Sequence, residues 1–339
     1  MQEEGKAIRL FSNLPLNVVY GGFECQCVQT CLALQKIGMN AKLWDWHDRK
    51  DVAEILHIFG LIPYLERVVK FNSINKKYFV SILMGMSNSN FKNHINRLLA
   101  TLLKNRYMFS QNQLLLQHAA GVFCLNEYEK AMAISCFRLD PKKVIIVPNG
   151  VNESRFNAKA SLFMDTFNIK APYVLYVGSI IQRKNPIDLA MALAKTDIKG
   201  VFIGKPMATE QVYFERFRKV ISENTNLMWI EELPYDSELL CSSYAGCSLF
   251  CLPSSSETQP LSAMEAMAAS RPIILGDREY AYAEPFGHSI KVCIGDIDDL
   301  RNKIRQILSN EDIYCHTLDK SYTWNCIART LASCYFKDE

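Results

Sequence analysis

The sequence predicts a two-domain α/β protein with a doubly wound parallel sheet in each half. Its 339 residues exceed the roughly 100–200 residues that usually form one domain. Short apolar segments alternate with helical segments along the whole chain, which is typical of parallel sheets covered by helices. Near the middle, the turn signal Pro148-Asn149-Gly150-Val151 opens a polar stretch that continues to about Pro172. We therefore place the first domain at residues 1–150.

The first half begins with a βαβ unit, the unit from which parallel sheets are made. An apolar strand at 7–11 leads into a turn at Tyr20-Gly21-Gly22, and a helix is predicted from 23 to 37, where Gly38 ends it. Further strands are predicted at 41–43, 78–83, 121–125 and 144–147. Between the second and third of these, an amphipathic helix is indicated by Phe91, Ile95, Leu98, Leu99, Leu102 and Leu103, interleaved with Lys92, Arg97, Lys104 and Arg106.

The second half restarts the alternation directly after the polar stretch. Helices are expected between its strands, including one at 296–308. Two doubly wound sheets that face each other leave a cleft at the carboxyl ends of their strands, where ligands bind. The predicted strands are 173–177, 200–203, 227–230, 248–252, 272–275 and 290–293.

The composition is that of an ordinary globular protein, with 49% hydrophobic and 22% charged residues. No apolar run reaches the ~18 residues of a membrane-spanning helix, and the first residues lack a signal-peptide layout. The 12 cysteines form no Cys-x-x-Cys pair, and Cys25, Cys27 and Cys31 share one helix without a histidine. We therefore expect reduced, buried cysteines, no metal site and a cytoplasmic location.

Charge is distributed unevenly between the halves. Residues 1–150 contain 18 Lys/Arg and 11 Asp/Glu, whereas the remainder contains 20 and 24. Between Arg67 and Arg106 there are eight basic residues and no acidic one. A basic first half favours an anionic partner, either phosphate groups or an anionic membrane surface contacted peripherally. Solvated charge on a plain face is the alternative.

The most informative local feature is the run from Pro253 to Ala269, which contains Glu257 and Glu265. It starts where an apolar strand ends and continues into a helix, so Glu257 lies in a strand-to-helix loop and Glu265 in the first turns. Unpaired amides at the helix start, at Leu261 and Ser262, are suited to a diphosphate. Carboxylates at such a loop can accept hydrogen bonds from sugar or ribose hydroxyls. Two ordinary helix-start charges are the alternative interpretation.

Two further segments could contact phosphate. Arg183 and Lys184 follow the strand that ends at Gly178, and Pro186 then starts a helix. Basic side chains at the mouth of a parallel sheet are placed to neutralise phosphate charge, although such a pair is often merely solvated. Glycines such as Gly21 and Gly22 let a backbone approach a phosphate closely, but they do not form a Gly-x-Gly-x-x-Gly pattern.

Taken in order, these segments resemble the GT-B glycosyltransferases of the family-4 type, which include sucrose synthase and many bacterial polysaccharide transferases. The Glu-x7-Glu spacing of Glu257 and Glu265, followed by Ala-Met-Ala, is the most specific part of the resemblance. The resembling segments are Gly21-Gly22, Val147 to Val151, Val177 to Lys184, Leu239 to Pro253, Glu257 to Ala268 and Tyr322-Thr-Trp324.

The resemblance implies a GT-B fold, with two Rossmann-like domains facing a central cleft. The second domain would span 151–320 and bind the donor, and the helix at 321–339 would return to the acceptor-side first domain. Glu257 would bind donor-sugar hydroxyls, Glu265 the ribose, and Lys184 with Arg183 the diphosphate. The other donor-binding positions implied are Gly21, Gly22, Gly178, Ser179, Gly204, Lys205, Leu233-Pro234, Pro260, Leu261 and Ser262.

The implied activity is that of a retaining hexosyltransferase. It would move a sugar from a nucleotide-diphosphate sugar (a UDP- or GDP-sugar) to a glycan or lipid-linked acceptor, in polysaccharide or glycoconjugate synthesis. In the usual scheme the departing diphosphate accepts the acceptor's proton, so neither a metal nor a further cofactor is required, and no nucleic acid is involved. Charge stabilisation by Lys184, Arg183 and helix-end amides would then drive the reaction.

Three positions depart from the family pattern. Ser179 stands where relatives commonly have Arg, and Thr258-Gln259-Pro260 replaces Gly-Phe-Gly, so that Pro260 offers no N–H. Met84-Gly85-Met86 stands where many relatives have a histidine near the acceptor. His57 is the nearer candidate, with an ordinary core or surface histidine as the favoured interpretation. The alternatives are a catalytically silent GT-B module that binds sugar nucleotides and a GT-B sugar-nucleotide epimerase.

Overall fold

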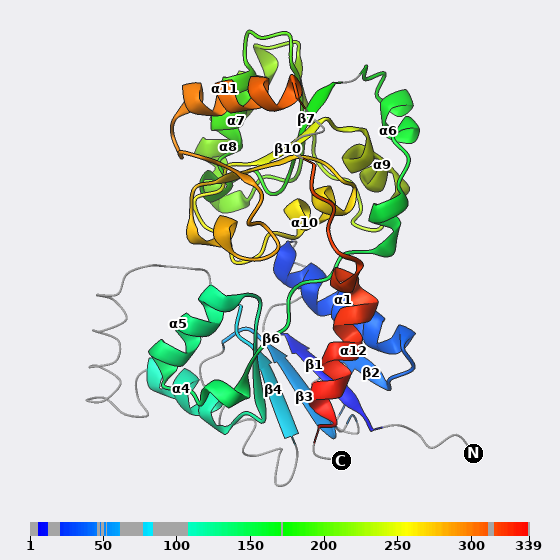
Figure 1. The fold of residues 1–339 in the computed structure, drawn as a ribbon, viewed down its shortest axis with the longest axis vertical. Coiled ribbons are helices and arrows are strands. Elements are labelled where there is room, and N and C mark those ends of the chain that lie inside the picture. Colours follow the sequence, from blue (N-terminus) through cyan, green and yellow to red (C-terminus); the bar gives the residue numbers. More distant parts are fainter. Residues whose placement is uncertain are drawn as a thin grey trace. The chain divides into compact units, whose positions relative to one another are not determined.

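The computed structural model describes residues 6–12, 21–45, 48, 51, 53–61, 77–83, 108–170, 172–310 and 315–337 (Figure 1). The chain divides into two compact units. The first unit contains Met1–Gly150 together with Ser321–Glu339, and the second contains Val151–Lys320. Each unit has its own six-stranded sheet in which every pairing is parallel. The predicted α/β class with two doubly wound parallel sheets is therefore confirmed.

The sheet of the first unit has the strand order β2-β1-β3-β4-β5-β6. Its strands are short and largely buried, as expected when helices cover both faces of a parallel sheet. The connection from β1 to β2 runs through a helix, which gives the predicted βαβ unit. The strands are β1 (Ile8–Ser12), β2 (Ala41–Leu43), β3 (Ile55–Phe59), β4 (Lys77–Ser81), β5 (Gly121–Cys124) and β6 (Val144–Ile146).

One strand of this sheet, β3, was missing from the sequence prediction. It pairs with β1 on one side and β4 on the other, so it lies inside the sheet. The segment Ile55-Leu-His-Ile-Phe59 is a short apolar run closed by Gly60, which is a strand signal. The prediction missed it because this segment was considered only for the role of His57, as a functional group or as an ordinary core or surface histidine, and not for its backbone conformation. A buried strand tolerates a polar side chain when that side chain finds hydrogen-bond partners.

The helices of the first unit lie in two groups. Helices α4 and α5 lie together on one side of the sheet, and α1 and α12 pack against each other on the other side (Figure 1). The last helix of the chain therefore belongs to the first unit. These helices are α1 (Gly22–Lys36), α4 (Met108–His118), α5 (Glu127–Phe137) and α12 (Trp324–Tyr335).

The turn at Asn149-Gly150 is packed against the start of α12. A Cβ atom added to Gly150 would lie 2.5 Å from the ring of Trp324 and 2.7 Å from its Cα atom. Only glycine therefore fits without a shift of the backbone. The predicted turn thus joins the last helix to the end of the first unit through a close backbone approach.

The sheet of the second unit has the order β12-β11-β10-β7-β8-β9. The chain builds outward from β7 to β8 and β9, then returns to place β10, β11 and β12 on the other side of β7. The order therefore reverses between β7 and β10. The strands are β7 (Tyr173–Val177), β8 (Lys199–Ile203), β9 (Leu227–Ile230), β10 (Leu249–Leu252), β11 (Ile273–Gly276) and β12 (Ile290–Val292).

The central strands of this sheet are buried on both faces, which explains their continuous apolar sequences. Every residue of β10 and β11 is buried, as are four of the five residues of β7. The surrounding helices close the core. They are α6 (Ser161–Thr166), α7 (Pro186–Leu193), α8 (Gln211–Ser222), α9 (Glu238–Gly246), α10 (Leu261–Ala268) and α11 (Ile297–Leu308).

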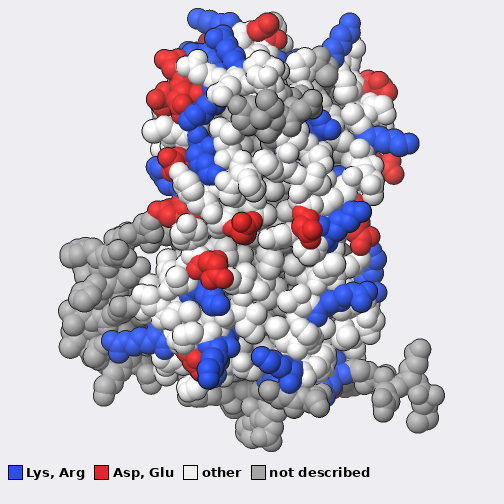
Figure 2. Space-filling model, viewed as in Figure 1, with Lys and Arg blue, Asp and Glu red and all other residues white. Residues whose placement is uncertain are grey.

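The surface carries both signs of charge. Figure 2 shows basic and acidic side chains interspersed over the described part of the visible face. Most of the basic run from Arg67 to Arg106, including Lys92, Arg97, Lys104 and Arg106, lies outside the described residues. None of the described helices combines the length and the apolar character needed to cross a membrane.

Candidate functional site

The candidate site lies in the second unit, at the carboxyl ends of β7 and β10. These neighbouring strands flank the point where the strand order reverses. In open α/β sheets, ligands bind in the crevice outside the carboxyl ends of the strands at such a switch point. The loop after β7 carries Arg183 and Lys184, and the loop after β10 carries Glu257. Two of the sequence-predicted segments are therefore brought together by the sheet topology.

Glu257 is the centre of this cluster. Its Oε1 atom lies 2.9 Å from Lys184 Nζ and 3.0 Å from an Arg183 guanidinium nitrogen. The Ser254 hydroxyl donates to the same oxygen at 3.0 Å. All contacts that the structure gives to the Glu257 carboxylate use Oε1. Nothing in the described part of the chain donates to Oε2, so this second oxygen can accept from an incoming hydroxyl.

Backbone contacts hold the two loops of the cluster together. The Ser255 N–H donates to the Arg183 carbonyl at 2.8 Å, and the Arg183 guanidinium donates to the Ser256 carbonyl. The Ser254 hydroxyl also lies within hydrogen-bond distance of the Arg183 carbonyl, at 3.1 Å. The predicted cation pair and the predicted glutamate are therefore parts of one preorganised structure.

The cations keep Glu257 ionised in spite of its burial. Burial by itself raises the pKa of this carboxyl, but the Lys184 and Arg183 charges outweigh it and hold the pKa of Glu257 below its ordinary value. Two cations and one carboxylate leave a net charge of about +1 in the cluster. A diphosphate group, which is strongly anionic, would find a complementary charge here.

Helix α10 begins next to this cluster and adds backbone donors. Pro260 is its N-cap residue, and the N–H groups of Ala263 and Met264 both donate to the Pro260 carbonyl. Among the described residues, nothing accepts from the N–H groups of Leu261 and Ser262, the first two residues of the helix. Such orphan donors at a helix N-terminus favour an anion.

The carboxyl ends of β7 and β8 approach closely. A Cβ on Gly204 would overlap the carbonyl oxygen of Gly178, so this approach depends on glycine. The Ile180 N–H donates to the Lys205 carbonyl at 2.8 Å, and the Trp229 indole donates to the Gly204 carbonyl at 2.9 Å. The backbones of the predicted positions Gly178 and Gly204 are therefore in direct contact at the carboxyl ends of β7 and β8.

The other predicted donor-binding positions near these strand ends differ in their exposure and in their partners. Lys205 forms an ion pair with Glu232, so its charge is already compensated. The Ser179 carbonyl accepts from the Tyr176 hydroxyl at 2.8 Å. Leu233 is half-buried and Pro234 is exposed, in the loop between β9 and α9. Their roles in base recognition stay predictions.

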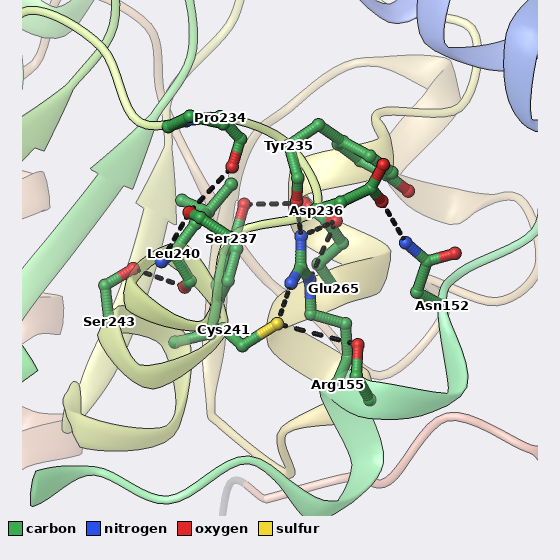
Figure 3. Close-up of polar contacts among 12 residues, drawn as sticks. Asn152, Arg155, Pro234, Tyr235, Asp236, Ser237, Leu240, Cys241, Ser243 and Glu265 are labelled. Atoms are coloured by element: carbon green, nitrogen blue, oxygen red, sulfur yellow. Dashed lines mark hydrogen bonds and ion pairs between the residues drawn. The ribbon is translucent and has the colours of Figure 1, made fainter. Parts of the chain in front are cut away.

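Glu265 lies in a separate, buried cluster rather than beside Glu257's cations. Its side chain is 4% exposed and pairs with Arg155 at 2.9 Å (Figure 3). The Tyr244 hydroxyl donates to its other oxygen at 2.8 Å. Both carboxylate oxygens are therefore already engaged. Burial and the Glu265 charge raise the pKa of Tyr244 far above its usual range. The ribose-binding role of Glu265 stays a prediction.

Arg155 is the residue of this cluster that the sequence analysis missed. It lies in a 3-10 turn, Glu153–Asn157, directly after the boundary between the units. The surrounding polar stretch indicated only a linker, and a lone arginine there resembles a solvated charge. The structure instead buries Arg155 completely. If Glu265, the second glutamate of the Glu-x7-Glu spacing, is buried, it needs a cationic partner. The sequence does not identify that partner.

Other predicted residues lie in the first unit. Gly21 is the N-cap residue of α1 and Gly22 its first residue, so the helix starts at the predicted glycines, whereas Tyr20 lies outside the described residues. Their role as hydrogen-bond donors to phosphate stays a prediction.

Met84 lies outside the described residues. His57 is fully buried on β3, where its ring nitrogens contact the Tyr335 hydroxyl at 2.6 Å and the Ser81 hydroxyl at 2.8 Å. Burial lowers the pKa of His57 to about 3, which fits a neutral core histidine.

Cysteines and metal ligands add nothing to this site. Of the 12 cysteines, seven are buried, four are half-buried and Cys293 is exposed, and none forms a disulfide in the described part of the chain. Within those same residues, no group of three or more His, Cys, Asp or Glu side chains is arranged to hold a metal ion. The chemistry that the site offers is therefore anion binding by cations and amides, beside one carboxylate oxygen that can accept from a hydroxyl.

Comparison with known proteins agrees with this geometry. Residues 162–322 match the family model described as glycosyl transferases group 1. Over 207 residues the chain is 25% identical to a Campylobacter jejuni protein named N-acetylgalactosamine-N,N'-diacetylbacillosaminyl-diphospho-undecaprenol 4-alpha-N-acetylgalactosaminyltransferase. That match covers 60% of this chain and 51% of the relative, so the chain spans about half of the relative's length.

Solved structures resemble the chain over nearly its full length. Sucrose-phosphate synthase from Thermosynechococcus elongatus superposes with a TM-score of 0.74 at 16% identity, covering 98% of this chain and 99% of that one. Anabaena HepE in complex with UDP-glucose gives a TM-score of 0.66 at 14% identity, covering 97% and 95%. At these identities the likeness establishes the fold. Together with the family match, it confirms the predicted resemblance to GT-B glycosyltransferases of group 1.

Proposed function

We propose that this GT-B chain, whose second unit is a glycosyl transferases group 1 domain, transfers a sugar from a nucleotide-diphosphate sugar with retention of anomeric configuration. The observation that carries the proposal is the Glu257–Lys184–Arg183 cluster at the switch point of the second sheet. It combines a net positive charge, helix-start amides and one available carboxylate oxygen. Those are the groups needed to hold a diphosphate beside a hydroxylated sugar ring.

In this proposal the leaving diphosphate is the centre of charge development. Lys184, Arg183 and the Leu261 and Ser262 amides stabilise the negative charge that grows on it as the sugar–phosphate bond breaks. Glu257 accepts a hydrogen bond from a sugar hydroxyl through Oε2 and keeps Lys184 oriented through Oε1. The departing diphosphate takes the acceptor's proton, so the reaction uses no protein base and no metal. The acceptor enters from the face of the leaving group, and the configuration is retained.

The donor is a UDP- or GDP-sugar, and the acceptor is a glycan or a lipid-linked glycan. The Anabaena structure named above contains UDP-glucose, which supports a nucleotide-sugar donor. The name of the Campylobacter relative contains diphospho-undecaprenol, which supports a lipid-linked acceptor. We propose the inner membrane face as the site of action. The basic first half of this chain suits such an anionic surface. We place the protein in the family-4 type of these enzymes.

A Glu257→Ala variant tests the proposal. Removing the carboxylate deletes the sugar contact but raises the net charge of the cluster by one. We expect release of nucleoside diphosphate from the preferred sugar nucleotide to fall by about 100-fold or more. Binding of the free nucleoside diphosphate, measured by calorimetry, should be unchanged or tighter.

The matched control is Glu223→Ala, which removes an exposed carboxylate that pairs with Lys219 at 3.8 Å on the surface of α8. This variant should behave as the wild type in both assays. The proposal fails if the wild type acts on no sugar nucleotide in a panel of UDP-, GDP- and ADP-sugars, or if Glu257→Ala keeps the wild-type rate. The anomeric proton signal of the product by NMR checks retention.

A further inference from the structure

The buried guanidinium of Arg155 connects three separate segments of the second unit (Figure 3). Its Nε donates to Glu265 on α10 at 2.9 Å, and one terminal nitrogen donates to the Tyr235 carbonyl at 2.6 Å. The other terminal nitrogen contacts the Cys241 sulfur on α9. The rings of Tyr235 and Tyr244 lie 5.4 and 5.6 Å from the guanidinium carbon. Every edge of the planar group is therefore used.

Two of these segments belong to the carboxyl-end edge of the sheet, where the ligand of a doubly wound domain binds. Tyr235 lies in the loop between β9 and α9, and α10 follows the loop after β10. Asn152 reinforces the first connection, because its side chain donates to Asp236 at 2.7 Å. Arg155 and Asn152 thus fix the β9–α9 loop and α10 at a set separation.

The burial of this ion pair needs an explanation beyond stability. Removing a guanidinium and a carboxylate from water is costly, and well-packed apolar residues of similar volume are often as stable or more stable. Buried ionic groups are best justified where they impose one specific arrangement. Here the arrangement imposed is that between the β9–α9 loop and helix α10, which follows the loop that carries Glu257.

The Arg155 cluster is independent of the Glu257 cluster. Glu257 is held by cations from the loop after β7, whereas Glu265 is held by a cation from the start of the second unit. No described side chain contacts both carboxylates. The two glutamates of the Glu-x7-Glu signature therefore have separate supports, and a change at one can leave the other intact.

We propose that Arg155 is a positioning residue for nucleoside recognition, which sets the β9–α9 loop against Glu265 and so determines affinity and base preference for the donor. The proposal rests on the donor class assigned above. Arg155 is fully buried, so in this proposal it does not contact the sugar nucleotide directly. It acts through the Tyr235 carbonyl and the Glu265 carboxylate, while diphosphate binding depends on the Glu257 cluster.

Arg155→Lys is the first test. A lysine keeps the positive charge but cannot donate to Glu265, the Tyr235 carbonyl and the Cys241 sulfur from one planar group. Binding of UDP, GDP, ADP and inorganic pyrophosphate is measured by calorimetry for the full chain. We expect the preferred nucleotide to bind about ten- to hundredfold more weakly and the preference among bases to shrink, with pyrophosphate affinity within about twofold.

A second variant separates positioning from folding. Replacing both partners, as Arg155→Met with Glu265→Leu, removes the buried charges together and should preserve the fold, which circular dichroism and the thermal midpoint verify. Because Glu265 is itself the predicted ribose contact, the double variant is used only to show that the fold and pyrophosphate binding survive loss of the buried pair, and Arg155→Lys carries the test of positioning. Phe217→Leu, a buried change on α8, is the control, because it lowers the thermal midpoint without changing the base preference.

The outcomes distinguish this inference from the proposed function. If the wild type binds a nucleotide and transfers sugar, but Arg155→Lys keeps its base preference and affinity, Arg155 is not a positioning residue. The inference is also overturned if pyrophosphate affinity falls as much as nucleotide affinity. If the wild type binds none of the nucleotides, the proposed function fails first, and this inference fails with it.

Discussion

Replacing either cation of the Glu257 cluster by methionine gives two variants with nearly the same starting geometry. Lys184 and Arg183 contact the same oxygen of Glu257, at 2.9 and 3.0 Å. Their direct Coulomb attraction to Glu257 is therefore almost equal. Their exposure differs, because the Lys184 side chain is 16% exposed and the Arg183 side chain is 44% exposed. Because solvent screens the more exposed charge more strongly, removing Arg183 should affect the rate less than removing Lys184.

The magnitudes follow from this difference. Removing one preorganised charge donor from a water-excluded site costs about 10²–10³ in rate, which applies to Lys184→Met. An exposed ion pair contributes only about 0.2–1 kcal/mol, so Arg183→Met should lower kcat/KM for the donor by up to about fivefold. Lys184→Met leaves Glu257 with Arg183 and the Ser254 hydroxyl. Its loss of unfolding free energy should therefore be that of one charge-assisted hydrogen bond, about 1.5–3 kcal/mol.

The assay is kcat/KM for the donor, measured as release of nucleoside diphosphate, with thermal midpoints recorded in parallel. Lys219→Met is the control, because within the described residues the ion pair of this exposed lysine is with Glu223, at the end of α8. Its kcat/KM should equal that of the wild type. Equal losses for Lys184→Met and Arg183→Met, or a larger loss for Arg183→Met, would refute the argument from burial.

Two further predictions concern the first unit. His57 has a pKa of about 3 in the folded protein and about 6.5 when unfolded, so the unfolded state binds more protons between these values. The stabilisation by neutral His57 is complete above pH 6.5 and is lost as the pH falls towards 3. The unfolding free energy of the wild type, measured relative to that of His57→Gln by urea titration, should therefore fall by about 2 kcal/mol from pH 7 to pH 5. The same difference between the two proteins at both pH values would contradict this. Gly150→Ala places a methyl group against Trp324 and should destabilise the first unit by about 1–3 kcal/mol, seen as a lower thermal midpoint, whereas an unchanged midpoint would contradict the packing described.

The sequence was sufficient for the features that depend on local pattern. Apolar runs such as Tyr173–Val177 and Leu227–Ile230 became strands with the predicted bounds. The helix that starts at Gly22 followed from glycines after an apolar strand, and the one at Ile297–Leu308 from its periodicity. Strand β3 was missed although its pattern was local, because the hydrogen-bond partners that make His57 tolerable there, Ser81 and Tyr335, lie far away in the chain.

The grouping of the candidate site depended on tertiary structure. Glu257 and Lys184 were chosen from sequence, but they are 73 residues apart and only the β7–β10 pairing brings them together. Arg155 carried no local signal at all, since it is 110 residues from Glu265 and stands in a polar stretch. Local sequence determines which segments become strands and helices and which residues end them. The burial and pairing of charged side chains are decided by which segments the sheet makes neighbours, because electrostatic partners depend on distance in space.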